Sequence, residues 1–463
     1  MKPNMKRIYN ILAIAAFAIL CSCNNYLDVQ PQGKVIPKTD EEFAALIHTH
    51  INNIEGGDDM FVVGNFESIM LNESFTDNLD ANVRIGNLAA YAGDKINTKQ
   101  YNYKSYFEII RDCNIVLENK ENISTDLAHE ICAASYALKG ICYYNMIRDY
   151  CPAYDPASDD QLGLPIIDKF DMDAMPVRAS LKATIEYTAN LLKKSASYGI
   201  SDRKFLIDEG AVNAYLAKLY FWAQDWDNCI ELCRNLMNVK EYQLATIQQY
   251  EQMIQSKNGW GQEIIIRSHI NNNADIDWYY SSYIKDFKTR PVNATLVKLF
   301  AEDKEKDVRY AVSFDRKRFN TKNLSGKVRG SEIVLMLAEC YYHKGDNTKA
   351  LEQLNYLRRN RIIGVEDLTV DNLPLPDKTQ KIIVDCTGRP VTPLLQAIFN
   401  ERRKELYAEG DRWFELKRNG CPELWIINNG LKYVTHKYLY TAPIYKGDTD
   451  LNPNIIQNEG YIE

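Results

Sequence analysis

The sequence predicts a mainly α-helical fold. We expect a scaffold of helix pairs, similar to tetratricopeptide repeats, with an irregular, loop-rich region packed onto it. Apolar residues recur at helical intervals in four ranges, 101–150, 177–238, 331–361 and 392–419. Two of these ranges contain copies of one residue pattern, as repeated helix pairs do. Residues 51–94 and 242–323 instead carry aromatic residues among many short polar ones, which favours loops.

The amino terminus has the features of a lipoprotein signal peptide, which we assign to residues 1–22. A cationic start precedes an apolar run from Ile11 to Leu20, which is too short to span a membrane. The run ends in the letters LCSC, which resemble a lipoprotein-processing box with Cys23 as the lipidated residue. The alternative is an ordinary secreted protein that is cleaved near Ser22. Residues 23–39 then form a polar tether, and 40–463 are expected to fold as a single domain.

Charge and cysteine usage exclude some classes of protein. The chain has 55 basic and 62 acidic residues, with no long basic run, which argues against nucleic acid as a partner. Of its 11 cysteines, an odd number follows Cys23, so a complete disulfide framework is not expected. Most of them lie in apolar helical stretches, where we expect small core side chains: Cys113, Cys132, Cys142, Cys229, Cys233 and Cys340.

The helices are expected in the following order. One begins after Thr39, and two more run from Tyr101 to Lys120 and from Leu127 to Tyr150. Another follows Ser180, whose hydroxyl group can cap its first turn. An insertion rich in Asp and Pro, from 365 to 393, separates the last two helical ranges.

An internal repeat supports the helix-pair scaffold. Residues Ala217, Tyr220, Asp225, Cys229 and Ile230 recur 121 positions later as Ala338, Tyr341, Asp346, Ala350 and Leu351. Each copy has the order helix, short polar turn, helix, and its small residues permit close helix approach. The copies are not tandem, so coincidence between two amphipathic helix pairs is the alternative.

The range 392–419 has an unusual charge pattern. Glu401, Glu405 and Glu409 are spaced four residues apart, which places them on one helix face. Three arginines lie within a turn of them, Arg402, Arg403 and Arg412. We expect an ionic cluster partly shielded from water, with Lys417 outside it. A fully solvated helix face is the alternative.

Several strings in this region resemble one protein family. ERRKELYAEGDRWFELKRNG, LNYLRRNR with Asn355, Arg358 and Arg361, and the closing LNPNIIQNEGY follow the order found in the SusD/RagB family of outer-membrane nutrient-binding lipoproteins. The resemblance implies non-catalytic capture of a nutrient at the cell surface. It also implies a partner, a TonB-dependent (SusC-like) β-barrel transporter, and a lipid anchor in the outer membrane.

Motifs for catalysis, metals and cofactors are not recognisable. The six histidines are dispersed, and there is no His-Glu-x-x-His helix, His/Cys pair at zinc spacing, nucleophile elbow or phosphate loop. The run from Asn271 to Asp277 alternates like the start of a calcium loop, but its turn glycine and closing glutamate are missing. We therefore expect no enzyme activity, no cofactor and no metal, with a solvated loop at 271–277.

Candidate ligand residues come from the two loop-rich ranges. Aromatic rings pack against sugar C–H groups, and neighbouring amides and carboxylates bind hydroxyl groups. We predict Trp278, Tyr279 and Tyr280 as stacking residues, with Asp77, Asn78 and Tyr91 as opposing contacts. In the alternative interpretation, Trp278 only fixes its loop to the scaffold.

The predicted function is capture of an oligosaccharide, or of another small nutrient such as a peptide. A glycan-acting enzyme and a helical-repeat adaptor that binds only proteins are the alternative hypotheses. Bond cleavage by the purified protein would identify the first alternative. Protein binding without affinity for small ligands would identify the second.

The lipoprotein assignment predicts that Cys23→Ala releases the protein from the membrane fraction, because a thioether to lipid needs the Cys23 sulfur. Fractionation and fatty-acid labelling of the variant measure this. Unchanged labelling together with continued membrane association would contradict the assignment.

Overall fold

The structure is a computed structural model that describes residues 37–83, 92–121, 124–171, 173–201, 205–256, 258–269, 287, 290–300, 303–428 and 430–461. The chain forms two compact units, Met1–Phe43 and Ala44–Glu463. Residues 1–22 lie outside the described part, as do residues 23–36 of the tether. No helix among the described residues is long and apolar enough to cross a membrane.

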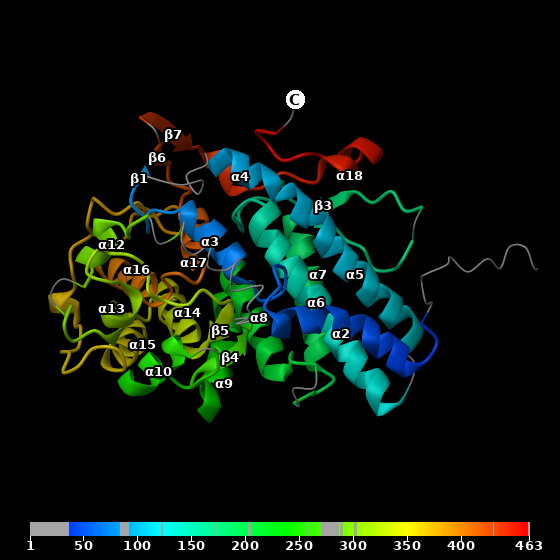
Figure 1. Cartoon of the computed structure of the whole chain (residues 1–463), viewed down its shortest axis with the longest axis horizontal. Helices are drawn as coiled ribbons and strands as arrows, with labels where there is room; N and C mark the ends of the chain where they lie inside the picture. Colours follow the sequence, from blue (N-terminus) through cyan, green and yellow to red (C-terminus); the bar gives the residue numbers. More distant parts are fainter. Residues whose placement is uncertain are drawn as a thin grey trace, which may run out of the picture. The chain divides into compact units, whose positions relative to one another are not determined.

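The second unit is built on antiparallel helices in which neighbours along the chain pack together, as expected for helix pairs (Figure 1). The predicted mainly α-helical class is therefore confirmed. Its helices are α5 (Gln100–Lys120), α6 (Asp126–Tyr150), α7 (Leu181–Ala196), α8 (Glu209–Trp222), α9 (Trp226–Met237), α14 (Gly330–His343), α15 (Asn347–Arg359), α16 (Pro393–Glu405) and α17 (Asp411–Arg418). Ser180 caps α7 as predicted, since its hydroxyl accepts from the Ala183 amide.

The two copies of the repeat have the same local geometry. In α8–α9 the amide of Asp225 donates to the Tyr220 carbonyl at 2.9 Å, and in α14–α15 Asp346 donates to Tyr341 at 2.9 Å. Both aspartates cap the second helix of their pair. The residue before each has positive φ, and glycine at 345 adopts it without strain. Helix α9 packs against α14, so the copies are neighbours in space.

The two ranges predicted to be irregular contain more helix than expected. Besides α2 (Asp40–Gly56), they hold α3 (Phe66–Ser74), α4 (Ala92–Thr98), α10 (Ile247–Gln255), α12 (Ala294–Lys298) and α13 (Val308–Ser313). Helix α3 begins where the side chain of Asn65 accepts from two backbone amides, and Thr246 and Gln249 form a capping box at α10. These capping residues were visible in the sequence, and each helix is only nine residues long.

Among the described residues, three small sheets complete the unit. Strands β1 (Asn82–Val83), β6 (Leu424–Asn428) and β7 (Leu431–Thr435) form one, in which β6 is central. The antiparallel pairs β2 (Leu162–Pro165) with β3 (Arg178–Ser180), and β4 (Ile264–Arg267) with β5 (Lys327–Arg329), form the others. Short helices lie at Lys240–Tyr242, Val370–Asn372, Lys437–Tyr440 and, as α18, at Lys446–Leu451. The prediction of buried core cysteines is confirmed for all six residues named above.

The ionic cluster predicted at α16 exists and is fully buried. Glu405 has no exposed surface, and its carboxylate accepts from Arg361 at 3.0 Å, from Arg329 at 2.6 Å and from Arg309 at 3.3 Å. Burial alone would raise the pKa of Glu405, but the three guanidinium groups outweigh it and hold this pKa well below its usual range. Together with Glu263, which binds Arg329 and Arg361, and Glu409, these residues are called the Glu405 cluster.

The predicted partners within the helix were wrong. Arg402 pairs with Asp411 at 2.6 Å, whereas Arg403 and Arg412 both reach Asp77. Arg402 and Arg403 follow Glu401 by one and two positions, so they project from other sides of α16. Arg412 lies on the separate helix α17, because α16 ends at Glu405. The prediction that Lys417 lies outside the buried charges was also wrong: it is 1% exposed and donates to the Arg148 carbonyl.

The Glu405 cluster predicts that Glu405→Gln lowers the free energy of unfolding by about 3–5 kcal/mol, because it leaves three buried arginines without their shared anion. Urea unfolding of the variant measures this loss. Glu352→Gln, in an exposed position of α15, is the matched control and should change stability little. Equal, small effects of the two substitutions would contradict a structural role for the cluster.

Candidate functional site

The predicted ligand residues are only partly covered by the structure. Trp278, Tyr279, Tyr280 and Tyr91 lie outside the described residues, as does the possible calcium loop at 271–277. Asp77 and Asn78 are described, and both lie just after α3. The environment of these two residues is therefore described first.

Asp77 forms a two-pronged ion pair with Arg412, with nitrogen–oxygen distances of 2.8 and 2.9 Å, and also lies 3.3 Å from Arg403. Burial alone would raise the pKa of Asp77, but the two guanidinium groups outweigh it and hold this pKa well below its usual range. Asp77 is thus a permanently charged group that is already balanced by arginines.

Asn78 connects two elements of the interior. It has no exposed surface; its amide nitrogen donates to Glu73 at 2.9 Å, and its oxygen accepts from Arg403 at 2.8 Å. These bonds fix the backbone that follows α3. Direct contact of Asn78 or Asp77 with a ligand stays a prediction.

A cavity of about 220 Å³ opens beside Asp77, against the hairpin formed by β6 and β7. We call it the hairpin cavity. Its walls come from the end of α3, the segment that leads into β1, the stretch before α12, and the hairpin itself. It is lined by Ser74, Phe75, Thr76, Asp77, Leu79, Ala81, Arg290, Asn293, Lys381, Leu424, Trp425, Ile426, Tyr433 and Thr435.

The register of the hairpin assigns its side chains to two faces. Leu424 pairs with Thr435 and Ile426 with Tyr433, so these four share one face. Their burial places this face inward, against the cavity. Trp425 belongs to the opposite face and is 39% exposed, with the Lys432 ammonium group 5.4 Å from its ring centroid.

The wall opposite the hairpin is polar. Arg290 is 3% exposed, and it donates to the carbonyl groups of Asp80 at 2.7 Å and Ser74 at 2.8 Å. Burial lowers the pKa of Arg290 to about 10, which leaves the guanidinium group charged at neutral pH. In the described part of the chain, no carboxylate forms an ion pair with Arg290. The cavity thus combines an apolar wall with fixed hydrogen-bond donors.

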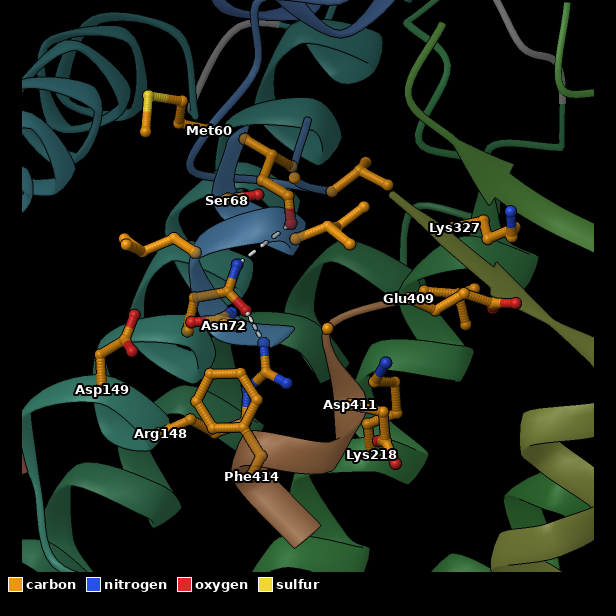
Figure 2. Close-up of a pocket in the computed structure, with 18 of the residues that line it drawn as sticks. Met60, Ser68, Asn72, Arg148, Asp149, Lys218, Lys327, Glu409, Asp411 and Phe414 are labelled. Carbon is orange, nitrogen blue, oxygen red and sulfur yellow. Dashed lines mark hydrogen bonds between the residues drawn. The ribbon is translucent and has the colours of Figure 1, made fainter. Parts of the chain in front are cut away.

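A second cavity, of about 110 Å³, lies among α3, α6, α8 and α17 and is lined by charged, uncharged polar and apolar side chains (Figure 2). Two lysines there are paired: Lys99 with Asp149 and Lys218 with Glu332, each at 2.7 Å. Arg148 covers the ring of Phe414, with its guanidinium carbon 4.2 Å from the centroid. Because most of its charged groups and the ring of Phe414 already have partners, this cavity is less suited to a sugar than the hairpin cavity.

The hairpin was missed in the sequence although a signal was present. Asn429-Gly430 separates two apolar runs, LWIIN and LKYVT, and this dipeptide is typical of tight hairpin turns. Gly430 has a φ of 80°, which such a turn requires. The Asn-Gly dipeptide could therefore have located one wall of the cavity.

Comparison with protein families gives two matches. A model described as the SusD family matches residues 313–461, and a model described as starch-binding, associating with the outer membrane, matches residues 25–221. No protein of curated function matches the sequence.

Solved structures of similar fold cover nearly the whole chain. A SusD superfamily protein from Bacteroides thetaiotaomicron is 18% identical, with a TM-score of 0.69 over 91% of this chain and 100% of its own. A SusD-like carbohydrate-binding protein from Bacteroides vulgatus is 18% identical, with a TM-score of 0.68 over 90% and 98%. A laminarin-binding SusD-like protein is 15% identical, with a TM-score of 0.60 over 92% and 100%. At these identities the likeness shows the fold alone.

Proposed function

Because this chain belongs to the SusD family, we propose that it captures an oligosaccharide without cleaving it. The observation that carries the proposal is the hairpin cavity, where an inward apolar face lies opposite fixed polar side chains. The description of the amino-terminal family model as starch-binding and the laminarin-binding structural neighbour support a glycan as the ligand class.

The cavity offers the two kinds of contact that a sugar ring needs. Tyr433 and Ile426 present apolar surface to the C–H face of a pyranose. Arg290 and Asn293 lie on the polar side, where they can bind ring hydroxyl groups. Arg290 is held by backbone carbonyl groups, so little side-chain entropy is lost when a ligand binds.

Aromatic residues predicted from the sequence extend this proposal. Ala81 and Arg290 line the cavity, and the segments that hold Tyr91 and Trp278 are close to them along the chain. We assign to Trp278, Tyr279 and Tyr280 the stacking of further sugar units, with Tyr91, Asp77 and Asn78 as the opposing set.

Binding is favoured over glycoside hydrolysis by the carboxylates of the cavity. Hydrolysis uses two carboxyl groups, one of which is an acid whose pKa is raised. Asp77 is the sole carboxylate on the described wall of the hairpin cavity, and its pKa is lowered. The described residues thus lack the required pair at this place.

The proposal includes a location and a partner. We assign a lipid anchor to Cys23, a position at the outer membrane facing the cell surface, and a TonB-dependent SusC-like transporter that receives the bound glycan. The signal-peptide features of residues 1–22 and the family model described as associating with the outer membrane support this assignment.

We expect Tyr433→Ala to weaken glycan binding roughly tenfold, because it removes one aromatic stacking surface from the cavity. A glycan array identifies the ligand, and calorimetric titration with that ligand measures the change. Tyr101→Ala is the matched control, since it removes an exposed tyrosine ring of α5 that does not line the cavity. Equal effects of the two substitutions on affinity would show that the hairpin cavity is not the binding site. Release of reducing ends from the glycan would show that the protein is an enzyme.

The stacking role of Trp278 predicts that Trp278→Ala loses affinity for the same glycan while the melting temperature stays unchanged. The melting temperature stays unchanged because a ring that contacts the ligand is not part of the hydrophobic core. Titration and thermal unfolding on the same preparation measure both quantities. Intact affinity, or a large fall in melting temperature, would exclude Trp278 from the site.

A further inference from the structure

The carboxyl-terminal end of α14 brings a carboxylate, an imidazole and a thiol together. Glu339 and His343 lie one turn apart on α14, and Cys386 comes from the loop before α16. The Nε2 atom of His343 is 3.7 Å from Oε1 of Glu339 and 3.7 Å from Sγ of Cys386. One ligand atom from each residue lies within 4.8 Å of the other two.

The imidazole and the thiol are held in place by different parts of the fold. The His343 ring stacks on Trp226 of α9, with centroids 4.5 Å apart and planes at 12°. The loop of Cys386 is closed by Asp385, whose carboxylate accepts from the Arg389 amide at 2.9 Å. Gln224 donates to the Cys386 carbonyl at 3.3 Å. The two groups therefore face each other without depending on a single flexible segment.

The carboxylate has one oxygen without a partner. Glu339 has no exposed surface, and Arg418 donates to its Oε1 at 2.5 Å. Oε2 is also buried, but it has no hydrogen-bond partner among the described residues. Buried carboxylate oxygens are nearly always paired, so an unpaired one beside an imidazole and a thiol calls for a ligand.

We propose that Glu339, His343 and Cys386 bind a divalent ion of the zinc class. Oxygen, nitrogen and sulfur donors together suit Zn²⁺ better than Ca²⁺ or Mg²⁺. Ligand atoms around tetrahedral zinc are about 3.4–3.6 Å apart, given its usual bond lengths. The distance of 3.7 Å between Nε2 of His343 and Sγ of Cys386 matches this closely. Three protein ligands leave the fourth position to water.

Coordination balances in charge and protons. The Cys386 thiol loses its proton to solvent as the sulfur–metal bond forms, and the thiolate and the Glu339 carboxylate then neutralise the ion. Arg418 occupies Oε1, a contact of the kind that orients ligating carboxylates, and leaves Oε2 for the metal. The positive charge of Arg418 opposes the ion, so binding is weaker than at an all-cysteine site.

Two other thiols in the scaffold are an alternative place for the metal ion to bind. Cys229 and Cys233 of α9 have their sulfur atoms 3.8 Å apart, and both are fully buried. Among the described residues, no carboxylate or imidazole forms a ligand group with them, and neither sulfur is exposed to solvent. In the Glu339–His343–Cys386 group only Glu339 is fully buried, so that group is more accessible.

Cobalt(II) titration of the mature chain tests the site, because a thiolate ligand produces an intense sulfur-to-cobalt absorption. We expect one equivalent of cobalt to bind and to be displaced by zinc. Cys386→Ser should abolish the sulfur band, and His343→Ala should weaken it strongly. Cys421→Ser is the matched control, since it also removes one half-buried thiol, and should keep the band.

Two results would overturn the proposal. One is the absence of stoichiometric binding to the unaltered chain. The other is a sulfur band that persists in Cys386→Ser, which would assign the metal to Cys229 and Cys233. Melting temperatures recorded without metal verify that the variants are folded. If Cys386→Ser does not fold, the cobalt titration of His343→Ala tests the proposal instead. None of these results depends on glycan binding, so the two proposals fail separately.

Discussion

The second unit depends on the buried carboxylate of Glu405, where ion pairs from several segments of the chain meet. Its oxygens are shared by arginines from three separate segments: Arg309 on α13, Arg329 on β5 and Arg361 after α15. Arg361 also donates to the Ala245 carbonyl, which ties the entry to α10 into the same group. A buried charge without its partner is expensive, so these segments can only take positions in which the ion pairs form together. The cluster thereby gives the irregular region a defined place on the helical scaffold.

Helices α16 and α17 also position the residues around the hairpin cavity. Arg403 on α16 and Arg412 on α17 project away from Glu405 and hold Asp77 and Asn78. These contacts fix the chain between α3 and β1, which forms one wall of the cavity. Strand β1 then pairs with β6, and β6 with β7, so the opposite wall is aligned through the sheet. The geometry of a surface cavity thus depends on charges that lie in the interior.

The sequence predicted features that depend on local spacing and missed those that depend on distant partners. Helical periodicity and the recurring Tyr220 and Tyr341 identified the scaffold, since both signals lie within single helix pairs. The four-residue spacing of Glu401, Glu405 and Glu409 indicated burial, but their partners come from other segments, which no local pattern reveals. Cys386 lies 43 positions after His343, so no metal motif joins them along the chain. The solvated loop at 271–277 and the stacking role of Trp278 stay predictions, because these residues lie outside the described part of the chain.

The two repeat copies are neighbours in space although α9 ends at Met237 and α14 begins at Gly330. The chain between α9 and α14 therefore closes a long loop that begins and ends where these two helices are in contact. The entropy lost on closing such a loop grows only with the logarithm of its length, by about 0.6 kcal/mol for each doubling. The stretches between the residues that anchor this segment to the Glu405 cluster, Glu263, Arg309 and Arg329, can therefore change in length at little thermodynamic cost. A change of length that displaced one of these anchors would instead leave a buried charge without its partner.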